Sequence, residues 1–278
     1  MLKHTSILLL GSALLFGSAA AMASELDASA YQQKLEQHLA QLPVTPTDTL
    51  QVNLNASFEA LNLRNDKREF GQLTTAVRTS SDGLQVSYPA EVIRLLNQGR
   101  SDDTPSETAF AMEYFDVAEL VDLFHPRDAI IERIRIGNLV RVVAMPEQQQ
   151  LRFEYALPLD ALIDDEELRG YVNEFEANYH LTVTEELYPV KAELNFYGDG
   201  SAYFFFDVNA AGKSIEHYAL HDGYLFVSES ESSQDFESTF SERRFSTSFV
   251  ANQIADNSDA ERHSTASLNA DVPQLAVD

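Results

Sequence analysis

A succession of short alternating segments separated by glycines, over residues 181–249, constrains the fold of this chain most. Apolar residues at every second position predict strands with one apolar face, and glycine beside Asp or Ala predicts turns between them. We expect turns at Gly198-Asp199-Gly200, at Ala211-Gly212 and at Asp222-Gly223. The segment is therefore predicted to be an antiparallel meander.

One expected strand of this meander carries four consecutive aromatic residues, Tyr203-Phe204-Phe205-Phe206. Phe204 and Phe206 alternate in phase with Ala202 and Val208, so this set is the candidate inner face, and Tyr203 and Phe205 face the other way. Apolar side chains on both faces need a cover, which is a helix, a protein partner or an apolar ligand. The row is either ordinary core or a binding surface.

The rest of the chain alternates between strand and helix patterns. Apolar residues at helical spacing predict helices over 31–42, 117–124 and 164–177, the first ended by Pro43 and the second by Pro126. Strict alternation predicts a strand over 52–60. The segments 70–79, 84–88, 130–145 and 151–157, next to turn signals, are also predicted as strands, and 92–96 as a strand or a short helix. The predicted fold class is α+β, mainly β: a curved antiparallel sheet covered by a few helices.

The first 23 residues have the pattern of a secretory signal peptide, with Lys3, an apolar segment over 7–16 and small residues ending in Ala21-Met22-Ala23. The apolar segment is shorter than the ~20 residues of a membrane anchor, the alternative that we considered. We expect cleavage after Ala23, a single β-rich domain over 24–250 and a disordered polar tail over 251–278. The chain has no cysteine, and export without disulfides favours a Gram-negative periplasm.

The charge balance restricts the partners. The chain has 44 acidic and 19 basic residues, with a formal net charge of −25. Such a surface repels nucleic acid and anionic headgroups, so we expect no nucleic-acid partner. We also expect no membrane-spanning segment after the signal peptide.

Few motifs indicate chemistry. His217 and His221 are four residues apart, which on a strand is ~13 Å and too far for a shared metal ion. Ala211-Gly212-Lys213-Ser214 resembles the end of a phosphate-binding loop, but Asp207 stands where that loop needs its first glycine. The acidic residues at 164–167 fit the first turn of a helix better than a cation site. We predict no metal, no cofactor and no enzymatic activity; a hydrolase without a recognisable motif is the second alternative.

Two phrases of the sequence resemble the periplasmic lipoprotein-carrier (LolA/LolB-like) superfamily: Asp82-Gly83-Leu84-Gln85-Val86-Ser87-Tyr88-Pro89 and Glu186-Leu187-Tyr188-Pro189-Val190-Lys191-Ala192-Glu193-Leu194. The similarity extends over roughly residues 29–250 as an order of elements. It implies a half-barrel whose concave side is plugged by helices and binds acyl chains. Residues 128–178 form a longer insertion than such a carrier needs, so the expectation is a relative that binds a hydrophobic ligand or a partner.

The sequence thus predicts a periplasmic, non-enzymatic protein that binds a lipid, an acyl chain or an apolar peptide on the concave face of its sheet. The alternative is a structural or interaction module that contacts another protein of the cell envelope. The candidate ligand-binding residues are apolar side chains of the expected inner face and of the helix at 117–124: Phe58, Tyr88, Phe153, Phe204, Phe206, Val117, Leu120 and Phe124.

Overall fold

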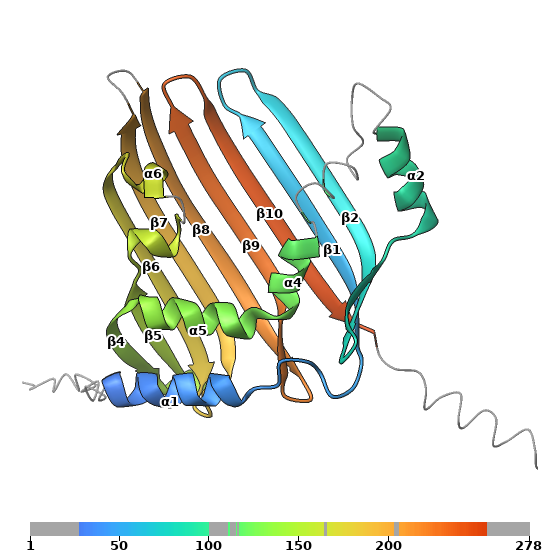
Figure 1. The fold of residues 1–278 in the computed structure, drawn as a ribbon, viewed down its shortest axis with the longest axis vertical. Coiled ribbons are helices and arrows are strands. Elements are labelled where there is room, and N and C mark those ends of the chain that lie inside the picture. The colour runs from blue at the N-terminus through green and yellow to red at the C-terminus, as the bar shows by residue number, and fades with distance from the viewer. Residues whose placement is uncertain are drawn as a thin grey trace, which may run out of the picture.

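The computed structural model describes residues 28–99, 111, 115, 117–163, 166–202 and 206–254, without the side chains of 96–99, 117, 118, 167, 168, 202 and 206. Within these residues, ten strands form one antiparallel sheet in the order β3-β2-β1-β10-β9-β8-β7-β6-β5-β4. The sheet is curved and open, and helices lie on one of its faces (Figure 1). The predicted fold class, α+β and mainly β, is confirmed.

The strands are long, and the first strand of the chain pairs with the last. Their bounds are β1 (Leu50–Asn62), β2 (Lys67–Ser80), β3 (Gly83–Ser87), β4 (Asn138–Met145), β5 (Gln150–Ala156), β6 (Val172–Thr184), β7 (Pro189–Ala202), β8 (Phe206–His221), β9 (Tyr224–Ser238) and β10 (Glu242–Gln253).

The described helices are α1 (Ala28–Gln41), α2 (Ala90–Gly99), α4 (Val117–Phe124), α5 (Pro126–Ile136) and α6 (Glu166–Arg169), with the short 3-10 turns η1 (Pro146–Gln148) and η2 (Leu159–Ala161). Helix α5 lies across the sheet from β4 to β9, and α1 runs beside it along one end of the sheet (Figure 1). In the part of the chain that the structure describes, no helix has the length and apolarity needed to cross a membrane.

The alternation of buried and exposed side chains along β1 shows which face of the sheet is covered. Leu50, Val52, Leu54, Ala56, Phe58 and Ala60 are buried, and the residues between them are more exposed. On the outer face, Ser57 pairs with Ser248 of β10 through a hydroxyl–hydroxyl hydrogen bond of 2.8 Å. Because side chains alternate along a strand, one row of this register assigns the whole strand pair to an inner and an outer face.

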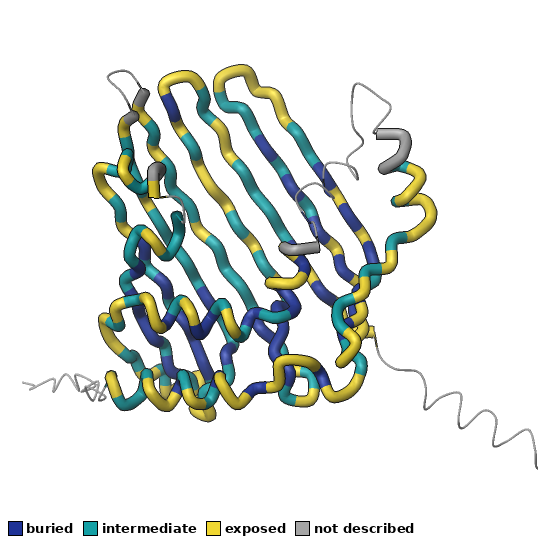
Figure 2. Tube along the Cα trace, in the orientation of Figure 1, coloured by how far each residue is buried: buried dark blue, intermediate teal, exposed yellow. Residues whose placement is uncertain are grey.

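The described helices lie over one half of the inner face, and much of the core lies under them (Figure 2). Leu35 and Leu39 of α1 and Ile130 and Ile134 of α5 are almost inaccessible to solvent. Phe124, at the end of α4, stacks on Phe226 of β9 with ring centroids 6.3 Å apart. Across the rest of β7–β10, most inner-face side chains are half-exposed.

Two expected elements over 130–145 and 164–177 are corrected. Residues 126–136 form α5, not a strand, because Pro126 begins a helix and Ile130, Ile131 and Ile134 then share its buried face. Only 138–145 is a strand. Conversely, 172–184 is strand β6, because pairing with both β5 and β7 outweighs the local helical spacing of Leu168, Val172 and Phe175.

Two expected turns do not exist. Gly198 and Gly200 lie inside β7, and Gly212 lies inside β8. These glycines serve close packing: a Cβ on Gly200 would be 2.6 Å from the carbonyl oxygen of Tyr171, and one on Gly212 would be 2.4 Å from the ring of Phe196. Their backbone angles are not in the left-handed region, whereas Gly83 and Gly223, which do occupy turns, have φ of 104° and 82°.

Ala202 and Phe206, which were expected on one strand, belong to two different strands. β7 ends at Ala202 and β8 begins at Phe206, and these two residues pair with each other. Tyr203, Phe204 and Phe205 lie outside the described residues, as does the side chain of Phe206. The expected tail after 254 also lies outside them.

Candidate functional site: the open face of the sheet

The part of the inner face that α4 and α5 leave uncovered is the candidate site. We call it the open face. It consists of residues from β7, β8, β9 and β10 in two adjacent rows: Leu194, Phe196, Gly212, Ser214, Ser232, Gln234, Phe245 and Thr247. All are half-exposed except Gln234, which is exposed. Figures 1 and 2 show this region beyond α5, where no described helix lies in front of β8–β10.

The shape of the open face depends on Gly212. The Cβ of any larger residue at 212 would overlap the ring of Phe196, so the ring lies against the backbone of β8. Leu194, Phe196 and Phe245 all pack from the side against the core cluster. The open face is thus an apolar extension of the core, and the hydroxyl pair Ser232–Thr247, at 2.7 Å, lies in the row next to that of Phe196 and Phe245.

The open face is free of charged side chains. From β6 to β1, its two rows read Tyr179–Leu194–Ser214–Ser232–Thr247–Phe58 and Ala177–Phe196–Gly212–Gln234–Phe245–Ala60. The outer face of the same strands carries charge in every comparable row, with Glu59, Glu176, Glu193, Lys213, Glu231, Asp235 and Arg244. A chain with a net charge of −25 thus keeps these two rows neutral.

Four of the eight residues predicted to bind a ligand lie in the core and not on the open face. Phe58, Phe153, Leu120 and Phe124 are at most 2% exposed, between the sheet and the helices. Tyr88 follows β3, is half-buried and packs against the edge of the core. Phe204 and the side chains of Val117 and Phe206 lie outside what the structure describes. Their roles in binding stay predictions.

The sequence did not single out Leu194, Phe196 and Phe245 as one site. Leu194 and Phe196 alternate with polar residues in β7, as on one face of a strand. The missing information was the pairing register of β7 with β8, and the position of the helices over the sheet. Gly212, interpreted as a turn, was the one local signal of a ring packed against a strand.

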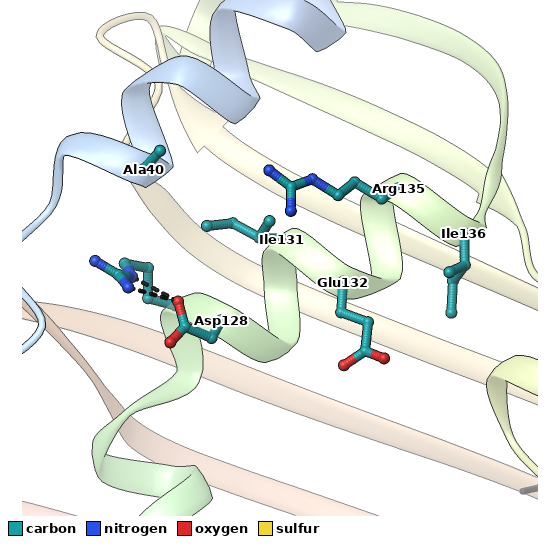
Figure 3. A pocket seen from close by; sticks show the side chains of 7 residues that line it. Ala40, Asp128, Ile131, Glu132, Arg135 and Ile136 are labelled. Carbon is teal, nitrogen blue, oxygen red and sulfur yellow. Dashed lines mark hydrogen bonds and ion pairs between the residues drawn. The ribbon is translucent and has the colours of Figure 1, made fainter.

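A pocket on the other flank of α5 has a different chemistry. It lies between α1 and α5 and is lined by Ala40, Arg127, Asp128, Ile131, Glu132, Arg135 and Ile136 (Figure 3). Arg127 pairs with Asp128 at 2.6 Å, and Arg135 with Glu36 at 3.4 Å. Both guanidinium groups thus already have carboxylate partners, which makes this pocket a weaker candidate than the open face.

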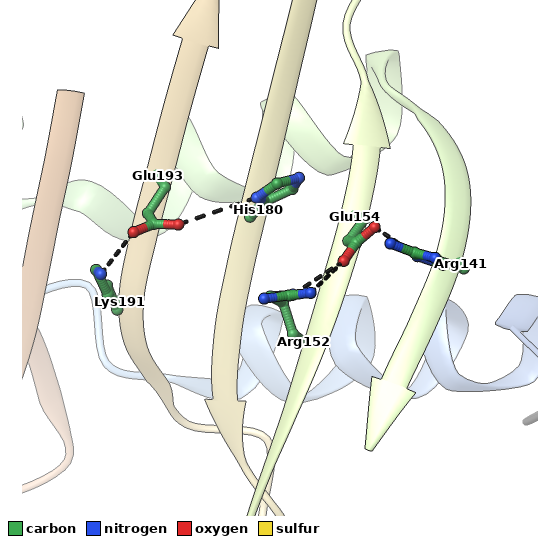
Figure 4. A network of polar contacts seen from close by, with 6 residues as sticks. All are labelled: Arg141, Arg152, Glu154, His180, Lys191 and Glu193. Carbon is green, nitrogen blue, oxygen red and sulfur yellow. Dashed lines mark hydrogen bonds and ion pairs between the residues drawn. The ribbon is translucent and has the colours of Figure 1, made fainter. Parts of the chain in front are cut away.

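A charged network occupies the outer face of β4–β7 (Figure 4). Glu154 accepts hydrogen bonds from Arg141 at 2.6 Å and from Arg152 at 2.9 Å. Burial by itself would raise the pKa of the Glu154 carboxyl, but the two guanidinium donors outweigh burial and lower it. His180 approaches Glu193 at 3.9 Å. Every acid here has a cationic neighbour, so the network stabilises the sheet.

The described residues do not assemble a metal site. His217 and His221 both lie on β8, as expected. Among the residues that the structure describes, no group of three or more His, Asp or Glu side chains is placed to hold a metal ion.

Comparison with models of protein families, with curated proteins and with solved structures found no match to this chain. The class of protein is therefore defined by its fold alone, an open curved sheet with helices over half of one face. The resemblance to lipoprotein carriers stays a prediction from sequence.

Proposed function

We propose that this protein is a non-enzymatic binding protein of the periplasm whose open face takes an apolar or amphipathic ligand. The observation that carries the proposal is the neutral pair of rows with half-exposed Leu194, Phe196 and Phe245 in a strongly acidic chain. Apolar side chains that remain exposed on a rigid sheet gain free energy when a ligand covers them, at about 25 cal/mol per Å².

The packed core supports this role. Phe58 of β1 is a diagonal neighbour of Phe245 of β10 on the same face of the sheet, with ring centroids 6.5 Å apart, and is itself buried. The predicted binding residues Phe153, Leu120 and Phe124 would then contribute indirectly. They would hold in place the sheet and the helices that border the open face, without contacting the ligand. Preorganised apolar surface binds without the entropic cost of ordering flexible side chains.

The test is titration of the purified protein with N-phenyl-1-naphthylamine, a neutral apolar dye whose fluorescence rises in apolar surroundings. The chain has no tryptophan, so dye emission is measured without a competing indole signal. We expect saturable binding. Because burial of a Phe side chain contributes about 1.5–3 kcal/mol, F196A and F245A are each expected to raise the Kd by roughly tenfold or more.

The matched control is Y197A. Tyr197 is the next residue of β7, lies on the outer face and is 47% exposed. The Y197A variant should bind the dye with the same affinity as the unchanged protein. Absence of saturable binding, or equal losses in Y197A and F196A, would refute the proposal; the second outcome would favour an interaction module that meets an envelope protein.

A further inference from the structure

One charged cluster borders the neutral open face. Glu216 of β8 lies in the inner-face row next to that of Leu194 and Ser214, and Arg133 of α5 lies above it with 3.8 Å between Nη1 and Oε1. Tyr218 donates a hydrogen bond to the other oxygen of Glu216, Oε2. Arg133 and Glu216 keep 32% and 21% of their side chains exposed, so these two members of the cluster are accessible from outside, whereas Tyr179 and Tyr218 are buried.

The helix geometry directs Arg133 toward the open face. Ile131 and Arg135 line the pocket beside α1. The Arg133 side chain, by contrast, reaches Glu216 of β8 and the ring of Tyr179 of β6, so it lies on the flank of α5 that faces the sheet. That flank borders the uncovered half of the sheet (Figure 1).

The cluster has unused hydrogen-bonding capacity. At 3.8 Å, the contact of Arg133 with Glu216 is an ion pair beyond hydrogen-bond distance. The guanidinium also lies over the ring of Tyr179, 5.7 Å from its centroid. The hydroxyl of Tyr179 is buried beside Arg133 and Tyr218 but makes no hydrogen bond of normal geometry. Burial raises the pKa of this hydroxyl to about 12, so it stays protonated and can donate.

We propose that Arg133 and Tyr179 bind the carboxylate of a long-chain monocarboxylic acid whose hydrocarbon chain lies on the open face. The inference rests on the proposed function, since it adds a headgroup site to the apolar surface. Successive inner-face residues of a strand are about 7 Å apart, so Leu194 and Phe196 lie within the reach of a short alkyl chain from the row of Glu216.

The charge of the cluster selects a single negative charge. Arg133 is the one cation of the cluster, and Glu216 already neutralises part of it. A dianionic phosphate would be repelled by the Glu216 carboxylate more than the single charge of Arg133 can offset. A carboxylate carries one negative charge and can share the guanidinium with Glu216. A neutral headgroup would leave the donors of Arg133 unused.

The experiment compares dodecanoate with dodecan-1-ol in isothermal titrations at pH 8. Both have the same chain, and only the first carries a carboxylate. Because a hydrogen bond to a charged group is stronger than a neutral one, we expect dodecanoate to bind about tenfold more tightly. R133Q and Y179F should lower the affinity for dodecanoate toward that of the alcohol and leave alcohol binding unchanged. E216Q should strengthen dodecanoate binding.

R135Q is the matched control, since Arg135 lies on the same helix and faces α1; it should change neither affinity. Y179F keeps the buried ring, so it remains informative if R133Q fails to fold. Equal affinities for acid and alcohol in the unchanged protein would overturn the headgroup inference and leave the proposed function intact. Binding of neither probe would overturn both.

Discussion

Phe196 of β7 and Gly212 of β8 are paired residues. Because Gly212 has no side chain, the ring of Phe196 can lie over it. Replacement of Gly by Ala inside a strand normally stabilises the chain, because glycine loses more conformational entropy on folding. Here the added methyl would overlap the ring of Phe196. We expect G212A to destabilise the protein by about 1–3 kcal/mol, as overpacking does.

A double-mutant cycle identifies the cause. If the clash with Phe196 is responsible, the pair G212A/F196A should recover most of the loss that G212A causes on its own, measured as the free energy of unfolding in urea. Additive losses in the double variant would mean that the ring is not what Gly212 accommodates.

The Glu154 carboxylate gives a pH-dependent contribution to stability. Its pKa is lowered in the folded state by the hydrogen bonds from Arg141 and Arg152. The stabilisation is therefore complete above the ordinary carboxyl pKa of about 4.3 and is lost as pH falls through the lower, folded value. Since Arg141 is 64% exposed, solvent screening limits the contribution to about 1 kcal/mol.

E154Q should thus be less stable than the unchanged protein by a constant amount from pH 8 to pH 5. The difference should shrink below pH 4, in urea unfolding followed by circular dichroism. A difference that is the same at pH 3 and pH 7 would argue that packing, and not charge, accounts for the effect.

At the scale of elements, α5 is held at its end by Gly137. The N–H of Gly137 closes the last turn on the carbonyl of Arg133 at 2.9 Å, and an added Cβ would be 2.8 Å from that oxygen and 3.0 Å from Leu157. Its φ of −73° suits any residue, so the constraint is space alone.

We expect G137A to lower the free energy of unfolding by about 1–3 kcal/mol, because the helix end must move off the sheet. G198A is the control: its Cβ would make ordinary contacts at 3.6 Å, so it should be neutral or stabilising. The thermal midpoints of the two variants, compared with that of the unchanged protein, measure these effects. A G137A midpoint equal to that of G198A would show that α5 tolerates displacement.

The sequence predicted an element correctly where the local pattern of residues fits only one kind of secondary structure. β1 was predicted because its polar and apolar residues alternate along the strand, and α4 because its apolar residues form a stripe. It failed over α5 and β6, where the local spacing fits two structures and the partner decides between them: α5 packs on the sheet, and β6 pairs on both sides. The open face was not predictable, because it is defined by what the helices leave uncovered.

At the scale of the molecule, β10 joins two groups of strands, β1–β3 and β4–β9, into one sheet. Ser248 is central in this junction, opposite Ser57 on one side and Glu231 on the other. A proline there removes a ladder hydrogen bond, which is why proline is found in sheets essentially only on edge strands and at bulges. We expect S248P to weaken the whole sheet, and S248A to lose only the hydroxyl pair, about 1 kcal/mol.

Amide hydrogen exchange distinguishes global from local effects. If the sheet is one cooperative unit, the most protected amides of β5, far from the substitution, should lose protection in S248P as much as those of β1. Unchanged protection in β5 would mean that the two groups of strands unfold separately.

The pairing of β1 with β10 also determines how early the sheet can fold completely. Ser57 and Ser248, hydrogen-bonded in the centre of the sheet, are 191 residues apart in the chain. A ribosome releases the first of them long before the second, and contacts so distant in sequence slow folding. The central ladder can close only after β10 has been synthesised, so the sheet cannot be completed while the chain is shorter than residue 253.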